Sequence, residues 1–408
     1  MERLDLSSIS DQERARLFLN HLDGFFLEFR KQSFGSSYFY EDSFVNETTI
    51  SGTIDGKNEN FFIRIVSDLN GNLKYLEFDD NKHGEYKEKI KNLIIDSLMK
   101  SLDGKKKTFY RRYHYTYIGP QLEGEYWIKG ARIAPIHDDE DNKVWDNVER
   151  YFSIELNVSA IDEPDADAKG NVESDIIAAR LSMLLDVGIS QPIVEHKWCI
   201  DVNNREDRKS KLYQTGYHGF GHSLKCMPKK KELMPCGSFK GTTYGSLRYV
   251  GELLSLPTET RKLFSKLDSS SREIQEAFNN CCFMYQISLT SGRYSPTVRL
   301  SYLVAAIESL AQCENSENKH FSNFIRHYAK DKVKIDDLLD FMHGEVRSAH
   351  FHSGKFAGGE YSYERDSVIH FQSVESRVRD MLFKESYKII RIAIASWIDA
   401  LIHKIPKD

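Results

Sequence analysis

The chain has 408 residues and a formal net charge of −5, and 40% of its residues are hydrophobic while 29% are charged. This is the composition of a globular protein, and the acidic balance excludes a uniformly basic nucleic-acid-binding protein, so any RNA contact must use local patches. Six scattered cysteines without paired spacing indicate free thiols in a reducing compartment. Charged first residues and the lack of about 18 consecutive apolar residues predict a cytoplasmic protein without a membrane-spanning helix.

The first half of the chain carries both strand and helix patterns, which predicts an α+β fold. Apolar residues three or four positions apart predict helices over 10–31, 87–102 and 175–185. Alternating aromatic and β-branched residues predict strands over 48–54, 61–66, 74–78, 108–117, 123–133 and 151–158. Asn70-Gly71 is typical of a hairpin turn between two of these strands. The acidic stretches 137–142 and 161–168 are expected to be solvated loops.

Residues 203–240 are rich in glycine, lysine and polar residues and show little periodicity. They predict an irregular connecting segment, 203–244, between a mixed α+β domain, 1–202, and a C-terminal domain, 245–408. Histidines and cysteines within this segment have the right chemistry for zinc, but their spacing matches no common finger. A glycine-rich loop is favoured, and we predict neither a metal nor a cofactor.

The C-terminal third loses the strand pattern and predicts an all-α bundle. Ser295-Pro296 is a helix start, because serine caps the first turn and proline suits its first position. The expected helices cover 253–267, 271–289, 296–310, 319–329, 336–347 and 368–403.

The most informative stretch of this region joins an arginine to a histidine five positions later, Arg347 and His352. Arginine can hold a phosphate and histidine can move a proton near neutral pH. On a regular helix the five-residue step rotates by about 140°, so the two side chains converge only if the helix ends or distorts, and Ser353-Gly354 favours an end. His350 is the rival general base. In the alternative interpretation, Arg347 and His352 only stabilise the helix C-terminus.

The order of these helices resembles the HEPN superfamily: two long helices, a short one, one ending in Arg-x4-His, and a closing helix. The sequence from Arg347 to Gly354 is most similar to the Apea-like branch. Glu308 stands where the family's second helix commonly carries an acidic residue facing the Arg-His site, and it is either paired with Arg347 or a surface residue. Ser348 departs from the Asn, Asp or His that active members often have after the arginine. The resemblance covers about residues 245–408.

The resemblance implies a metal-independent endoribonuclease that acts as a homodimer. Arg347 would hold the phosphate and His352 would transfer protons, while Glu308 and Ser348 would orient them. The Apea-like branch further implies bacterial defence against phage by abortive infection, through cleavage of tRNA or other cellular RNA. The N-terminal domain would then sense a phage-derived trigger or select the substrate. The alternative function is a non-catalytic HEPN module that binds RNA or a protein partner.

A basic and aromatic run from Lys105 to Tyr115 could follow an RNA backbone and stack bases. Strand alternation would place Arg111 and Arg112 on opposite faces. In the alternative interpretation, the run is a hairpin with a charged solvent face. The residues predicted to contact RNA are Lys106, Lys107, Arg111, Arg112 and, beyond the motif, Lys355.

Overall fold

The chain folds into two compact units, Met1–Phe109 with Val158–Gly170, and Tyr110–Asn157 with Asn171–Asp408. Each unit contains an antiparallel sheet, and the second also contains the helices of the C-terminal half, so the fold is α+β as predicted. These units divide the chain elsewhere than the predicted positions 202 and 244. The computed structural model describes residues 2–9, 12–27, 30–54, 57–78, 84–103, 105–136, 149–192, 196–200, 210–214, 223–229, 236–239, 253–329, 335–361 and 374–403.

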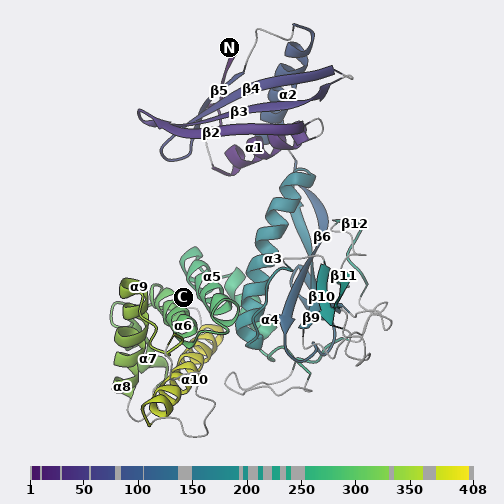
Figure 1. Ribbon diagram of the computed structural model, residues 1–408. Coiled ribbons are helices and arrows are strands. Elements are labelled where there is room, and N and C mark those ends of the chain that lie inside the picture. The colour runs from purple at the N-terminus through teal and green to yellow at the C-terminus, as the bar shows by residue number, and fades with distance from the viewer. Residues whose placement is uncertain are drawn as a thin grey trace. The chain divides into compact units, whose positions relative to one another are not determined.

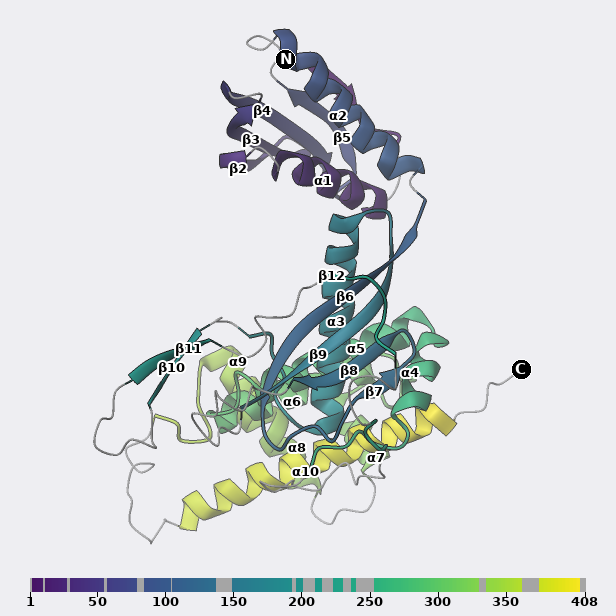
Figure 2. The same ribbon diagram turned by 90° about the vertical axis from the view of Figure 1, so that its right-hand side faces the viewer.

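The first unit is a five-stranded sheet with strand order β1-β5-β4-β3-β2. Helices α1 (Gln12–Leu27) and α2 (Gly84–Asp103) lie on one face of this sheet (Figures 1 and 2). Leu6, Phe18 and Leu76 are among the buried residues that join the helices to the sheet. The strands are β1 (Glu2–Asp5), β2 (Arg30–Tyr40), β3 (Ser43–Ile54), β4 (Lys57–Asp68) and β5 (Leu73–Phe78).

The predicted turn at Asn70-Gly71 is confirmed and has a clear physical cause. The Asp68 carboxylate accepts hydrogen bonds from the amides of Asn70 and Asn72, at 2.8 and 2.9 Å, and Gly71 has φ of +85°. Glycine adopts this left-handed conformation without steric cost. The strand β2 was not predicted, because its glycine and serine residues hide the alternation that marks a strand.

The second sheet has strand order β12-β6-β9-β8-β7, and α3 (Glu163–Leu185) packs on it (Figure 2). The hydroxyl of Tyr115 in β6 donates a hydrogen bond to the Asp175 carboxylate of α3 and lies within hydrogen-bonding distance of the Ser174 hydroxyl, each at 2.8 Å. The strands are β6 (Lys107–Ile118), β7 (Tyr126–Ile128), β8 (Ala131–Ile136), β9 (Glu149–Ala160) and β12 (Ser223–Leu224). A separate hairpin joins β10 (His196–Ile200) to β11 (Ser210–Gln214).

Two predictions in this region are wrong. The expected single strand over 123–133 is a hairpin, because Gly130, with φ of +75°, turns the chain between β7 and β8. The acidic stretch 161–168 is not a loop, since α3 begins at Glu163. The Asp162 carboxylate accepts a hydrogen bond from the Asp165 amide at 3.0 Å and caps the helix, and acidic residues suit a first turn. The other acidic stretch, 137–142, lies outside the described residues.

A buried network of charged side chains crosses the second sheet. The Arg132 guanidinium donates to Glu125 at 2.7 and 2.8 Å and to Glu155 at 2.8 Å, and these three side chains are at most 4% exposed. Arg112 pairs with the other oxygen of Glu155 at 2.8 Å. The indole of Trp127 donates to Glu125 at 2.9 Å. The network therefore satisfies buried charges on three neighbouring strands.

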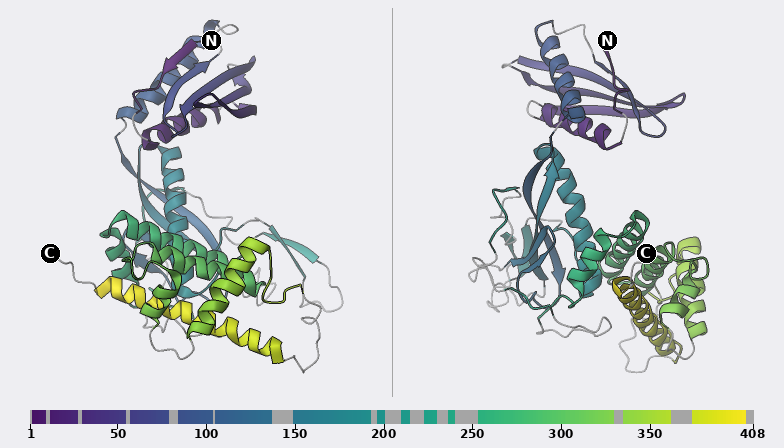
Figure 3. Two further views of the ribbon diagram at one scale, coloured as in Figure 1. Left: turned by 90° about the vertical axis from the view of Figure 1, so that its left-hand side faces the viewer. Right: turned by 180° about the vertical axis from the view of Figure 1, so that it is seen from behind.

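The C-terminal helices follow in the order expected from the sequence, and α10 runs along the others (Figure 3). Ser295 caps α6 by accepting a hydrogen bond from the Val298 amide, which confirms the predicted start. The first helix begins later than predicted, since Leu254 instead forms a β-bridge with Leu122. The helices are α4 (Thr260–Asp268), α5 (Arg272–Leu289), α6 (Pro296–Ala311), α7 (Phe321–Tyr328), α8 (Ile335–Asp340), η2 (Phe341–Ser348), α9 (Ala349–Ser353) and α10 (Val374–His403).

Within the second unit, polar contacts hold the helical bundle against α3. Arg391 of α10 donates to the carbonyl oxygen of Met183 at 3.0 Å and to the Tyr285 hydroxyl at 2.8 Å. The Tyr285 hydroxyl in turn donates to Asp186 at 2.7 Å. The sheet and the bundle are thus parts of one compact unit. Among the described helices, none is long and apolar enough to cross a membrane.

Candidate active site

The helix that carries the arginine and the histidines is built from three consecutive segments, α8, η2 and α9. It continues to Ser353, six residues beyond the predicted end at Arg347. Gly354 then adopts φ of +62° and its amide donates to the His350 carbonyl oxygen at 3.0 Å, as Ser353-Gly354 led us to expect. The middle segment, η2, is a π-helix of eight residues. The π-helical distortion therefore includes Arg347 and ends at Ser348, while His350 and His352 lie on the α-helical segment α9.

The π-helix brings His343 and Arg347 to the same side of the chain. Its hydrogen bonds span five residues, so each turn is wider than an α-helical turn and two side chains four positions apart lie close together. Gly344 stands between them, and glycine in a helix interior weakens α-helical geometry. Rare helical segments of this kind are frequent at functional sites. The local geometry thus marks this part of the helix as a candidate site.

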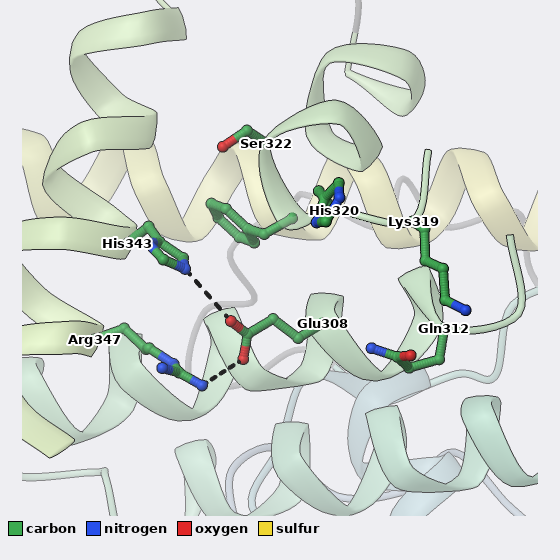
Figure 4. Close-up of a pocket in the computed structure, with 8 residues that line it drawn as sticks. Glu308, Gln312, Lys319, His320, Ser322, His343 and Arg347 are labelled. Atoms are coloured by element: carbon green, nitrogen blue, oxygen red, sulfur yellow. Dashed lines mark hydrogen bonds and ion pairs between the residues drawn. The ribbon is translucent and has the colours of Figure 1, made fainter. Parts of the chain in front are cut away.

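Glu308 of α6 joins these two side chains, as Figure 4 shows. Its Oε2 atom accepts a hydrogen bond from Arg347 Nη2 at 3.0 Å, and its Oε1 atom lies 3.6 Å from His343 Nε2. All three side chains are partly exposed, so they remain reachable from solvent. Of the two interpretations of Glu308, the structure selects the pairing with Arg347. The Nε atom of Arg347 is buried and has no hydrogen-bond partner among the described residues.

Glu308 and Arg347 line a pocket of about 490 Å³. Its other lining residues come from the segment that joins α6 to α7, from the first turn of α7 and from η2, namely Gln312, Lys319, His320, Phe321, Ser322 and His343. The ring of Phe321 lies 5.9 Å from that of His343 and supports it. The lining is mostly polar and contains one carboxylate among four basic side chains. A pocket of this kind suits an anionic ligand.

The remaining residues of the predicted motif lie outside this pocket. Ser348 makes no side-chain capping hydrogen bond, and His352 is exposed near the end of α9. The ring of His350 packs against Phe356 at 5.0 Å, and its buried Nδ1 atom has no hydrogen-bond partner in the part of the chain that the structure describes. The packing of His350 suits a structural role, whereas His352 is open to a ligand or a second molecule.

An aromatic surface adjoins the motif. Phe351 is 46% exposed, contacts Tyr302 edge to face at 5.8 Å, and lies 5.6 Å from the guanidinium carbon of Arg347. Tyr361 is 81% exposed and packs against Phe356. Exposed aromatic rings beside an arginine can stack on the bases of single-stranded nucleic acid.

Burial corrects part of the prediction for RNA-binding residues. Arg111 is only 2% exposed, and the guanidinium of Arg112 is held by the buried Glu155, so neither is available to an RNA backbone. Lys106 is exposed but lies 3.5 Å from Glu13. Lys107 and Lys355 are exposed, and Lys355 follows the motif helix directly. These three lysines stay predictions.

The loop after the motif is tied to the start of α6 by Glu360. Burial raises the pKa of Glu360, but hydrogen bonds from the Thr297 amide and from the hydroxyls of Ser295 and Thr297 outweigh it, so the pKa is lowered. Because the pKa of Glu360 is lower in the folded chain than in the unfolded chain, its carboxylate stabilises the folded contact at pH values above the pKa of the unfolded chain. This stabilisation is lost as the pH falls through the pKa of the folded chain. The loop should therefore loosen below about pH 4.5.

Glu360→Gln is expected to weaken this attachment at pH 7 by about 1 kcal/mol and to remove its acid sensitivity. Hydrogen exchange at the amides of Thr297 and Gly358, compared at pH 7 and pH 3, measures both effects. Glu345→Gln is the matched control, since Glu345 is an exposed glutamate of η2. An equal acid response in the wild type and in Glu360→Gln would contradict the prediction.

Sequence reasoning missed the pocket residues that flank Glu308. His343 could have been found, because it lies four residues before Arg347 on a predicted helix. Lys319 and His320 carry no such signal, because they reach the pocket only through the packing of α7 against α6.

No family model, curated protein or solved structure matches this chain.

Proposed function

We propose that this chain is a metal-independent endoribonuclease of the HEPN type. The observation that carries the proposal is the pairing of Arg347 with Glu308 across two neighbouring helices, at the mouth of a polar pocket. The pairing supports the role that the resemblance gives Glu308, which is to orient the arginine. The exposed aromatic rings beside Arg347 add a surface suited to RNA bases.

RNA supplies its own nucleophile, the 2′-hydroxyl group. An enzyme must deprotonate this group, stabilise charge on the phosphorus centre and protonate the leaving 5′-oxygen. Arg347 holds the phosphate and its developing charge, while His352 transfers a proton. A second subunit supplies the second histidine, since His352 is exposed at the surface. The products then carry 2′,3′-cyclic phosphates.

The proposed biological role is abortive infection in bacteria. Cleavage of tRNA or another cellular RNA stops growth of the infected cell, and the N-terminal unit responds to a phage-derived trigger or selects the substrate. This role rests on the resemblance of the motif region to the Apea-like branch.

The test is cleavage of cellular RNA by the full chain in a bacterial host, with and without phage challenge. Wild type and Arg347→Ala are expressed in a bacterial host, and RNA ends that carry cyclic phosphates are sequenced. Arg347→Ala is expected to lower the yield of new ends by about 10²–10³-fold, since it removes the group that stabilises charge. A wild-type protein that makes no such ends under either condition would contradict the proposal.

One observation favours the alternative, a non-catalytic module that binds RNA or a protein partner. His352 does not line the pocket that contains Arg347 and Glu308. Ser348 makes no capping contact either. RNA crosslinking that persists in His352→Ala, with no cleavage by either form, would support this alternative.

A further inference from the structure

The pocket that Arg347 shares with Glu308 extends to side chains that the proposed reaction does not use. Gln312 directly follows α6, Lys319 and His320 directly precede α7, and Ser322 lies in the first turn of α7. Figure 4 shows Lys319 and Gln312 on the side of Glu308 opposite to Arg347 and His343. The pocket thus has a second end, which we call the Lys319 end.

The charges at the two ends differ. At the first end the carboxylate of Glu308 interacts with both Arg347 and His343, so positive charge there is compensated. At the other end Lys319 and His320 are exposed, and within the described part of the chain neither side chain has an ion-pair or hydrogen-bond partner. An uncompensated ammonium group in a hollow of this size attracts an anion.

We propose that the Lys319 end of the pocket is a phosphate-binding subsite, whose ligand is a phosphate group carried by a nucleotide or by an RNA chain. The phosphate oxygens accept hydrogen bonds, and Lys319 and Gln312 supply an ammonium donor and an amide donor. His320 adds positive charge when it is protonated. The volume of about 490 Å³ leaves room for more than a phosphate group alone.

The two sources of the phosphate have different relations to the proposed function. Binding of a free nucleotide is independent of any nuclease activity. Binding of an RNA chain rests on the proposed function, because the subsite would hold a neighbouring phosphate while Arg347 holds the one at which cleavage occurs.

The experiment is calorimetric titration of the full chain with three probes: inorganic phosphate, adenosine 5′-monophosphate and a 2′-O-methyl oligoribonucleotide. The last lacks the 2′-hydroxyl and cannot be cleaved. Lys319→Ala is expected to weaken binding of the nucleotide or the oligonucleotide by about tenfold, the effect of one charge-assisted hydrogen bond. Lys262→Ala, which removes an exposed lysine of α4, is expected to leave the affinity unchanged.

Binding of the nucleotide, or of the oligonucleotide alone, supports the subsite and names the source of its phosphate. Equal affinities of wild type and Lys319→Ala, binding of inorganic phosphate alone, or no binding of any probe would overturn it. Cleavage of unmodified RNA is measured on the same preparations. If binding depends on Lys319 but no RNA is cleaved, the phosphate subsite is supported and the proposed nuclease activity is rejected. If RNA is cleaved but Lys319→Ala binds the probes as tightly as the wild type, the nuclease activity is supported and the subsite is rejected.

Discussion

His352→Ala is expected to lower the rate of metal-free RNA cleavage by about 10²–10⁴-fold, the usual contribution of one proton-transfer group. Its side chain is exposed near the end of α9, and the chain ends this helix immediately afterwards at Gly354. The variant should keep its fold, because an exposed side chain contributes little to packing. Single-turnover cleavage, read as the appearance of 2′,3′-cyclic phosphate ends, measures the effect.

Two other histidines of the same helix provide the comparison. His350→Ala is expected to reduce stability more than chemistry, because the ring packs against Phe356. His343→Ala removes the histidine that lies 3.6 Å from Glu308. If His343→Ala or His350→Ala lowered the cleavage rate more than His352→Ala does, the assignment of the proton transfer to His352 would be wrong. Circular dichroism of each variant separates loss of fold from loss of chemistry.

Local sequence patterns predicted most of the helices and the hairpin turn between β4 and β5. Ser295-Pro296 marked the start of α6, and Asn70-Gly71 marked the turn before β5, because each acts through its own backbone. The pattern failed where tertiary contacts decide the outcome. Arg111 lies on the face of β6 that also carries the buried Tyr115 and Tyr117, and alternation defines two faces of a strand without showing which of them is exposed to solvent.

In the candidate site, too, the sequence predicted some features and tertiary packing decided the others. The sequence left two interpretations of Glu308 open, a pairing with Arg347 or a surface position, and the structure shows the pairing. The π-helix could not be predicted, since it depends on how η2 packs against α6 as well as on Gly344. The position of Lys319 depends on the packing of α7. The sequence therefore identified the two charged residues, while packing in three dimensions decided their pairing and defined the pocket around them.

Arg132→Met is expected to destabilise the second unit by about 3–5 kcal/mol, the cost of leaving a buried charge without its partner. The substitution keeps most of the side-chain volume and removes both hydrogen bonds to the fully buried Glu125. Glu155 loses one bond but keeps Arg112. Chemical denaturation followed by tryptophan fluorescence measures the loss, because Trp127 hydrogen-bonds to Glu125.

The double variant Arg132→Met with Glu125→Gln tests the cause. Glutamine removes the uncompensated charge, so the double variant should regain most of the stability that the single variant loses. The control is Lys129→Met, in the turn between β7 and β8. It breaks an exposed ion pair with Asp268 and should lower the free energy of unfolding by less than about 1 kcal/mol. A double variant as unstable as the single one would mean that Arg132 acts through its packing, because removing the charge of Glu125 would then have no effect.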